Sequence, residues 1–91
     1  MSINETLKQR GGRYGDIETV SEINYQLMEV IEKSPNYDAL TATHKMSLFM
    51  IFHKIARMTC GELNYEDNPH DIAGYATLLE NYMEEQNNEN V

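Results

Sequence analysis

The chain has 91 residues, and its 7 Lys and Arg stand against 15 Asp and Glu, which gives a net charge of −8 at pH 7. This length predicts one small domain. A chain this acidic is expected to repel long nucleic acid and anionic membranes. No apolar run approaches the roughly 20 residues that span a bilayer, and the N-terminus lacks the order of a signal peptide. We therefore expect an intracellular protein with neither long nucleic acid nor membrane as a partner.

The positive charges are confined to two short parts of the sequence. Residues 1–15 carry a net charge of +2, and residues 39–61 contain three basic residues and no acid. Residues 62–91 contain eight acids and no base. Two basic segments can form a site for a small anion, while the acidic remainder of the chain repels RNA and DNA. The alternative is that these basic residues pair with acids of neighbouring helices.

The first expected helix covers residues 3–10, because Ser2 and Glu5 have the spacing of a capping box. Gly11 and Gly12 end this helix. Three glycines within five positions then favour a loop, since they destabilise a helix and free the backbone to adopt positive φ.

The second expected helix starts at Asp16, whose side chain is a good N-cap. Its apolar positions recur at helical spacing until about Ser34. It ends there because Pro35 disfavours helical geometry in the residue before it. Residues 36–40 form a connector.

The third expected helix is capped by Thr41 or Thr43 and ends at Gly61. Residues 46–52 within it are apolar on nearly every side. This pattern predicts a helix at the centre of a bundle or in a subunit interface.

The fourth expected helix begins with Asn68 and Pro69, a cap and first-turn pair, and runs to about Gln86. We expect one helical domain over residues 1–86 and a flexible polar tail over residues 87–91. No strand alternation occurs, so the predicted fold class is an all-α, four-helix protomer.

The segment Arg10-Gly-Gly-Arg-Tyr-Gly-Asp16 combines three features that suit a nucleotide. The guanidiniums of Arg10 and Arg13 can each bind phosphate oxygens through two hydrogen bonds. The amide of Gly12 can approach an anion because no Cβ stands in the way. Tyr14 offers a ring face on which a base can stack. The alternative is an ordinary turn between helices, in which Tyr14 covers the core and the arginines pair with acids.

A second polar cluster, His53, Lys54 and Arg57, shares one arc of the third helix. On a helix otherwise so apolar, this cluster suits a second phosphate grip, with His53 donating to a base or a phosphate. The alternative is that the three side chains are buried partners for Asp67 and Asp71. Both interpretations can hold together.

A third group lies on the fourth helix, where Asp71 and Tyr75 share an arc. A carboxylate on a half-buried face needs a cation, so a structural salt bridge is the favoured interpretation of Asp71. Gly74 costs about 1 kcal/mol relative to alanine inside a helix, so we expect another helix or a ligand to approach it closely. No histidine has zinc spacing with Cys60, and no metal site is predicted.

These motifs, with Gly61-Glu-Leu-Asn-Tyr65, resemble a family of small bacteriophage proteins over about residues 5–83. That family is distantly similar to the all-α MazG-type nucleotide pyrophosphohydrolases, which assemble as dimers or tetramers. The resemblance implies a MazG-like helical bundle in a homo-oligomer. Such enzymes hold Mg²⁺ with Glu-x-x-Glu and a later Glu-x-x-Asp. Glu29 and Glu32 have the first spacing, but the second is missing.

A nucleotide pocket that lacks the carboxylates needed to hold Mg²⁺ suggests that the protein binds a nucleotide and does not hydrolyse it. The chain also resembles the anti-CBASS sponge proteins of phages, helical tetramers that sequester cyclic dinucleotide signals such as 3′3′-cGAMP. This resemblance implies the cytoplasm of an infected bacterium as the location, a cyclic dinucleotide as the ligand and a homotetramer as the assembly, with no cofactor. Chemistry alone assigns the ligand contacts to Arg10, Gly12, Arg13, Tyr14, His53, Lys54, Arg57, Asp71 and Tyr75.

Two alternative functions come from other classes. One is a Mg²⁺-dependent nucleoside triphosphate pyrophosphohydrolase that uses four carboxylates, Glu29, Glu32, Asp67 and Asp71. The other is a protein-binding inhibitor whose acidic helix face mimics nucleic acid to block a host factor. In that case the acids that carry the activity are Glu80, Glu84 and Glu85.

Overall fold

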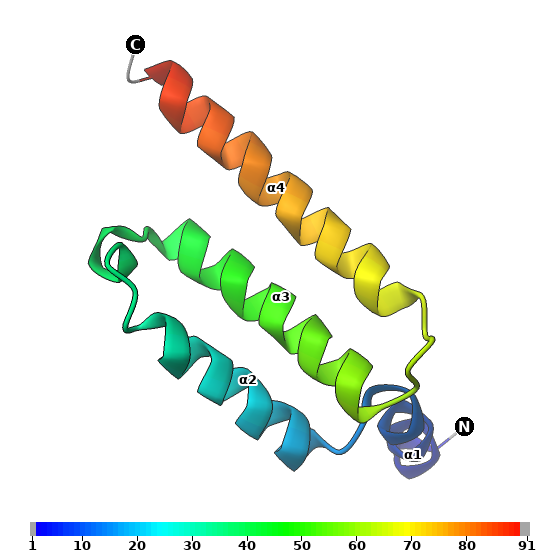
Figure 1. Cartoon of the computed structure of the whole chain (residues 1–91). Coiled ribbons are helices and arrows are strands. Elements are labelled where there is room, and N and C mark those ends of the chain that lie inside the picture. The colour runs from blue at the N-terminus through cyan, green and yellow to red at the C-terminus, as the bar shows by residue number, and fades with distance from the viewer. Residues whose placement is uncertain (1, 90–91) are drawn as a thin grey trace.

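The computed structural model describes residues 2–89, and in this range every long element is an α-helix. Figure 1 shows three long helices side by side, with α3 between α2 and α4, and α1 at one end of α3. The elements in chain order are α1 (Ile3–Tyr14), α2 (Ile17–Ile31), a short 3₁₀ turn (Tyr37–Ala39), α3 (Ala42–Cys60) and α4 (Asp67–Glu89). The prediction of an all-α chain with four helices is confirmed.

α3 is the central helix, as its apolar sequence predicts. It packs against α2 on one side, against α4 on the other and against α1 at its C-terminal end. The connections are short, so neighbouring long helices run antiparallel. A hydrogen bond ties the far end of α4 to the start of α3, because the Tyr82 hydroxyl donates to the Thr41 hydroxyl at 3.0 Å.

The predicted caps of the first three helices are present. Ser2 and Glu5 form the capping box of α1, and the Asp16 carboxylate accepts from the Thr19 amide at 3.2 Å. Thr41, one of the two residues considered, caps α3 and forms a capping box with His44. These signals are local, so the sequence alone places them.

The predicted loop over residues 10–15 is wrong, because α1 continues through Gly11 and Gly12 to Tyr14. The helix ends only at Gly15, whose φ of 89° belongs to the left-handed region. Two interior glycines cost a helix about 2 kcal/mol together. Contacts at the end of α1 offset this cost, and they involve residues far away in the sequence.

Those contacts join the end of α1 to the end of α3. The Glu62 amide donates to the Arg13 carbonyl at 2.9 Å. A Cβ on Gly61 would overlap the Arg13 carbonyl group, and a Cβ on Gly15 would lie 2.5 Å from the Cβ of Cys60. The absence of side chains at both glycines therefore lets the two helix ends meet backbone to backbone.

α4 differs from its prediction at both ends. It begins at Asp67, so Asn68 lies inside the helix, and the buried side-chain amide of Asn68 makes no hydrogen bond and so does not cap it. The Glu66 carbonyl instead accepts the first bond, from the His70 amide at 3.1 Å. The helix includes residues 87–89, which the sequence assigned to a flexible tail, and residues 90–91 lie outside the described range.

Candidate functional site

α1 lies at the C-terminal end of α3, and residues of α1, α2 and α3 together line a hollow of about 480 Å³. We call this hollow the corner pocket. Its basic and aromatic lining comes from α1 and α3, and its apolar lining comes from α1 and α2, to which Asp16 and Ser21 add polar groups. The residues that line it are Leu7, Arg10, Gly11, Tyr14, Gly15, Asp16, Ile17, Val20, Ser21, His53 and Arg57.

Tyr14 is the centre of the polar wall. The Arg57 guanidinium carbon lies 4.4 Å from the centre of the Tyr14 ring, and that of Arg10 lies 5.9 Å from it. Arg57 comes from α3 and Arg10 from α1, so the ring joins the two basic segments of the sequence. The attraction between a cation and an aromatic face holds both guanidiniums beside the pocket.

A second tyrosine extends this arrangement behind the pocket. The Tyr65 ring meets Tyr14 edge to face, with centres 5.5 Å apart, and the Arg13 guanidinium lies 5.4 Å from the centre of Tyr65. Hydrogen bonds with Asp67 and Tyr14 raise the pKa of Tyr65 to about 12, because they favour the neutral phenol. Tyr65 therefore stays uncharged at physiological pH and supports Tyr14 from the side.

His53 lies next to Arg57 on the pocket wall. Burial lowers the pKa of His53 below 6.5, and the positive charges of Arg57 and Lys54 lower it further. The imidazole is thus neutral at pH 7 and keeps one donor and one acceptor. Its Nδ1 atom is buried without a hydrogen-bond partner.

The guanidiniums at the pocket have no carboxylate partners in the described part of the chain. Over residues 2–89 there is one ion pair, between Lys54 Nζ and Asp71 Oδ2 at 3.1 Å. Asp16 does line the pocket, but its carboxylate is the N-cap of α2 and accepts from Thr19. An anion that enters the pocket therefore meets positive charge that neighbouring acids have not neutralised.

Four of the nine residues assigned to the ligand line this pocket: Arg10, Tyr14, His53 and Arg57. Arg13 is one step behind them, against Tyr65. Gly12 is inside α1, where the helix uses its amide, so the sequence-based role for a free amide at Gly12 is wrong.

The other three assigned residues lie elsewhere. Lys54 and Asp71 bind each other between α3 and α4, as the structural alternative predicted, and the Lys54 side chain is buried. Tyr75 is half-buried on α4 and is absent from the lining of the corner pocket. Gly74 is also on α4, and a Cβ built there meets no atom within 4 Å, so the close approach expected at Gly74 does not occur in the protomer.

Sequence reasoning missed the apolar side of the pocket and the role of Tyr65. Leu7, Ile17 and Val20 come from α1 and α2, and only the fold shows that these two helices meet around a hollow. Tyr65 ends the motif Gly61-Glu-Leu-Asn-Tyr65, but the sequence alone assigns this residue no part in ligand binding. Its position depends on the chain turn after Gly61, which brings it to Tyr14.

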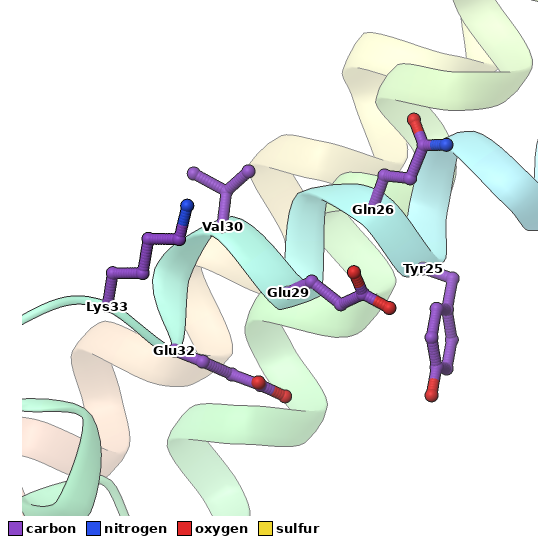
Figure 2. A pocket seen from close by; sticks show the side chains of 6 residues that line it. All are labelled: Tyr25, Gln26, Glu29, Val30, Glu32 and Lys33. Carbon is purple, nitrogen blue, oxygen red and sulfur yellow. The ribbon is translucent and has the colours of Figure 1, made fainter.

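Two other hollows have less to offer a ligand. The larger, about 720 Å³, is lined only by α2 and the turn after it. Figure 2 shows its side chains spread apart rather than converging on a common point. They are Tyr25, Gln26, Glu29, Val30, Glu32 and Lys33. The other, about 630 Å³, is an open surface along α4 that includes Asp71, Gly74 and Tyr75.

The carboxylates named for the pyrophosphohydrolase alternative do not assemble in one protomer. Glu29 and Glu32 lie at the C-terminal end of α2, whereas Asp67 and Asp71 lie at the start of α4, at the other end of the molecule. Within residues 2–89, no three His, Cys, Asp or Glu side chains are grouped so that they could hold a metal ion.

No family model matches the chain, and neither does any curated protein or solved structure. Among the described helices, none is both long enough and apolar enough to cross a membrane. The geometry and chemistry of the corner pocket are therefore the basis of the function proposed below.

Proposed function

We propose that the protein binds a small nucleotide in the corner pocket and holds it without cleaving it. The observation that carries this proposal is the convergence of Arg10 and Arg57 on the ring of Tyr14, with no carboxylate paired to either guanidinium in the described range. Paired guanidiniums are suited to a phosphodiester because each presents several donors in one plane.

The same wall can also hold a base. Arg57 covers the Tyr14 ring, so a base that enters stacks on the guanidinium plane and extends the Arg57 and Tyr14 stack by one layer. Neutral His53 offers one donor and one acceptor to a base edge or a phosphate. Leu7, Ile17 and Val20 provide the apolar surface on which a ribose or base edge packs.

We propose a cyclic dinucleotide such as 3′3′-cGAMP as the ligand. This molecule has two phosphodiesters and two bases, and a volume near 480 Å³ is within the usual range for such ligands. Its two-fold chemistry suits a homo-oligomer, for which we propose four copies. Sequestration in the cytoplasm of an infected bacterium would keep the signal from its CBASS receptor.

Calorimetric titration with 3′3′-cGAMP tests this proposal. We expect nanomolar affinity for the unchanged protein, which corresponds to about −12 kcal/mol. Arg57→Ala removes a charged hydrogen-bonding group worth about 2–3 kcal/mol and should weaken binding about 100-fold. Lys33→Ala is the matched control, because it removes one positive charge outside the corner pocket and should leave the affinity unchanged.

Separate assays distinguish the alternatives. Intact cyclic dinucleotide recovered after incubation with Mg²⁺ and heat release supports binding alone, whereas nucleoside monophosphate and pyrophosphate that accumulate from a nucleoside triphosphate indicate the pyrophosphohydrolase. If Arg57→Ala binds as tightly as the unchanged protein, the corner pocket is not the site. If neither cyclic nor linear nucleotides raise the melting temperature, and charge reversals at Glu80 and Glu84 abolish activity, the protein-binding inhibitor is favoured.

A further inference from the structure

The protomer buries unusually little apolar surface. Val20 and Ala56 are the only buried apolar residues in the described range. The accessible surface is 6810 Å², whereas a compact monomer of 10.5 kDa exposes about 5,400 Å². The excess of about 1,400 Å² exceeds the roughly 800 Å² that each partner buries in a standard stable interface. The chain therefore has enough surplus surface to form one.

Several exposed apolar side chains of α2 and α3 lie on the side of these two helices where α1 is. On α3, Met46, Phe49, His53 and Arg57 follow one another at spacings of four and three, so they lie along one line. This line starts at Arg57 in the corner pocket and so lies on the side where α1 is. Met46 is 63% exposed and Phe49 is 42% exposed.

A second line runs beside it on α2. Ile17 and Ser21 line the corner pocket, and Tyr25 continues their line one turn further. Ile17 is 78% exposed and Tyr25 is 67% exposed. With the line on α3 and the exposed Ile3 and Leu7 of α1, these residues form what we call the α1-side face.

We propose that the α1-side face is covered by the same face of a second copy of this chain. The surplus surface is sufficient for such a contact, and the face is continuous with the corner pocket. The second copy would cover the open side of the corner pocket, so that the bound ligand would contact both copies.

Sedimentation of the ligand-free protein tests the face. We expect a mass of at least twice 10.5 kDa at micromolar concentrations. Met46→Lys places a charge in the contact and should reduce the mass to that of one chain while circular dichroism shows the same helix content. Val30→Lys is the control, because Val30 is 62% exposed but, nine residues after Ser21, lies on the opposite side of α2. This variant should remain assembled.

A wild-type protein with the mass of one chain would overturn the proposal, and so would a Met46→Lys protein that stays assembled. Loss of assembly in Val30→Lys as well would show that the contact is not confined to this face. These measurements use no nucleotide, so their failure is separate from a failure of nucleotide binding.

Discussion

Replacement of Gly11 and Gly12 by alanine is expected to stabilise the protein, because both residues lie inside α1. Alanine is favoured over glycine in a helix by about 1 kcal/mol per position. A Cβ at either position meets no atom within 4 Å, so no packing is lost. The pair should therefore add up to about 2 kcal/mol, or on the order of 10 °C in melting temperature for a domain of this size.

Two measurements follow this change. Thermal unfolding by circular dichroism reports the stability of the whole chain, and amide hydrogen exchange over residues 3–14 reports the stability of α1 itself. Nucleotide affinity of the Gly12→Ala protein should be unchanged, because the helix already uses the amide of Gly12 and this residue does not line the corner pocket. The Gly12→Ala variant thus separates a structural role for this segment from a binding role.

Gly61→Ala is the matched control, since it adds the same methyl group where there is no room. Its Cβ would overlap the Arg13 carbonyl and lie 2.7 Å from the carbonyl carbon of Tyr14, so α1 must move away from α3. Overpacking of this kind costs about 1–3 kcal/mol. A loss of stability or of nucleotide binding in the Gly12→Ala protein would refute a helical α1 and restore the glycine-rich loop.

Three further predictions concern titratable side chains. Asp71→Asn should cost more stability in urea unfolding, about 2–3 kcal/mol, than Lys54→Met, about 1 kcal/mol, because the Lys54 side chain is 11% exposed and Asp71 is 41% exposed. Equal losses would contradict this burial. The lowered pKa of His53 makes the unfolded chain take up a proton more readily below pH 6.5, so stability should fall as the pH falls below 6.5. His53→Gln should flatten that part of the pH profile. Asp67→Asn should lower the pKa of Tyr65 from about 12 towards 10 in an ultraviolet titration, and an unchanged value would exclude Asp67 as the cause.

The sequence predicts features that depend on neighbouring residues. The caps at Ser2, Asp16 and Thr41 need only the residues that follow them within one turn, and all three are present. The central position of α3 follows from its apolar composition. The pairing of Lys54 with Asp71 was foreseen as an alternative, because a buried charge needs a partner.

The sequence does not predict features that depend on distant backbone. Local propensity favours a loop at Gly11, but the approach of Gly61 to Arg13 holds the last turn of α1 in place. The same approach brings Arg57 onto Tyr14 and so creates the corner pocket. A pattern of single residues carries no information about which two helix ends will touch.

The small number of buried apolar residues has a consequence for the life of the protein in a cell. Because Val20 and Ala56 are the only buried apolar residues among those described, segments of an isolated chain open at a low free-energy cost, and proteases cleave open segments. A partner that covers the α1-side face slows this proteolysis. The amount of protein that accumulates therefore rises with the fraction of chains whose α1-side face is covered.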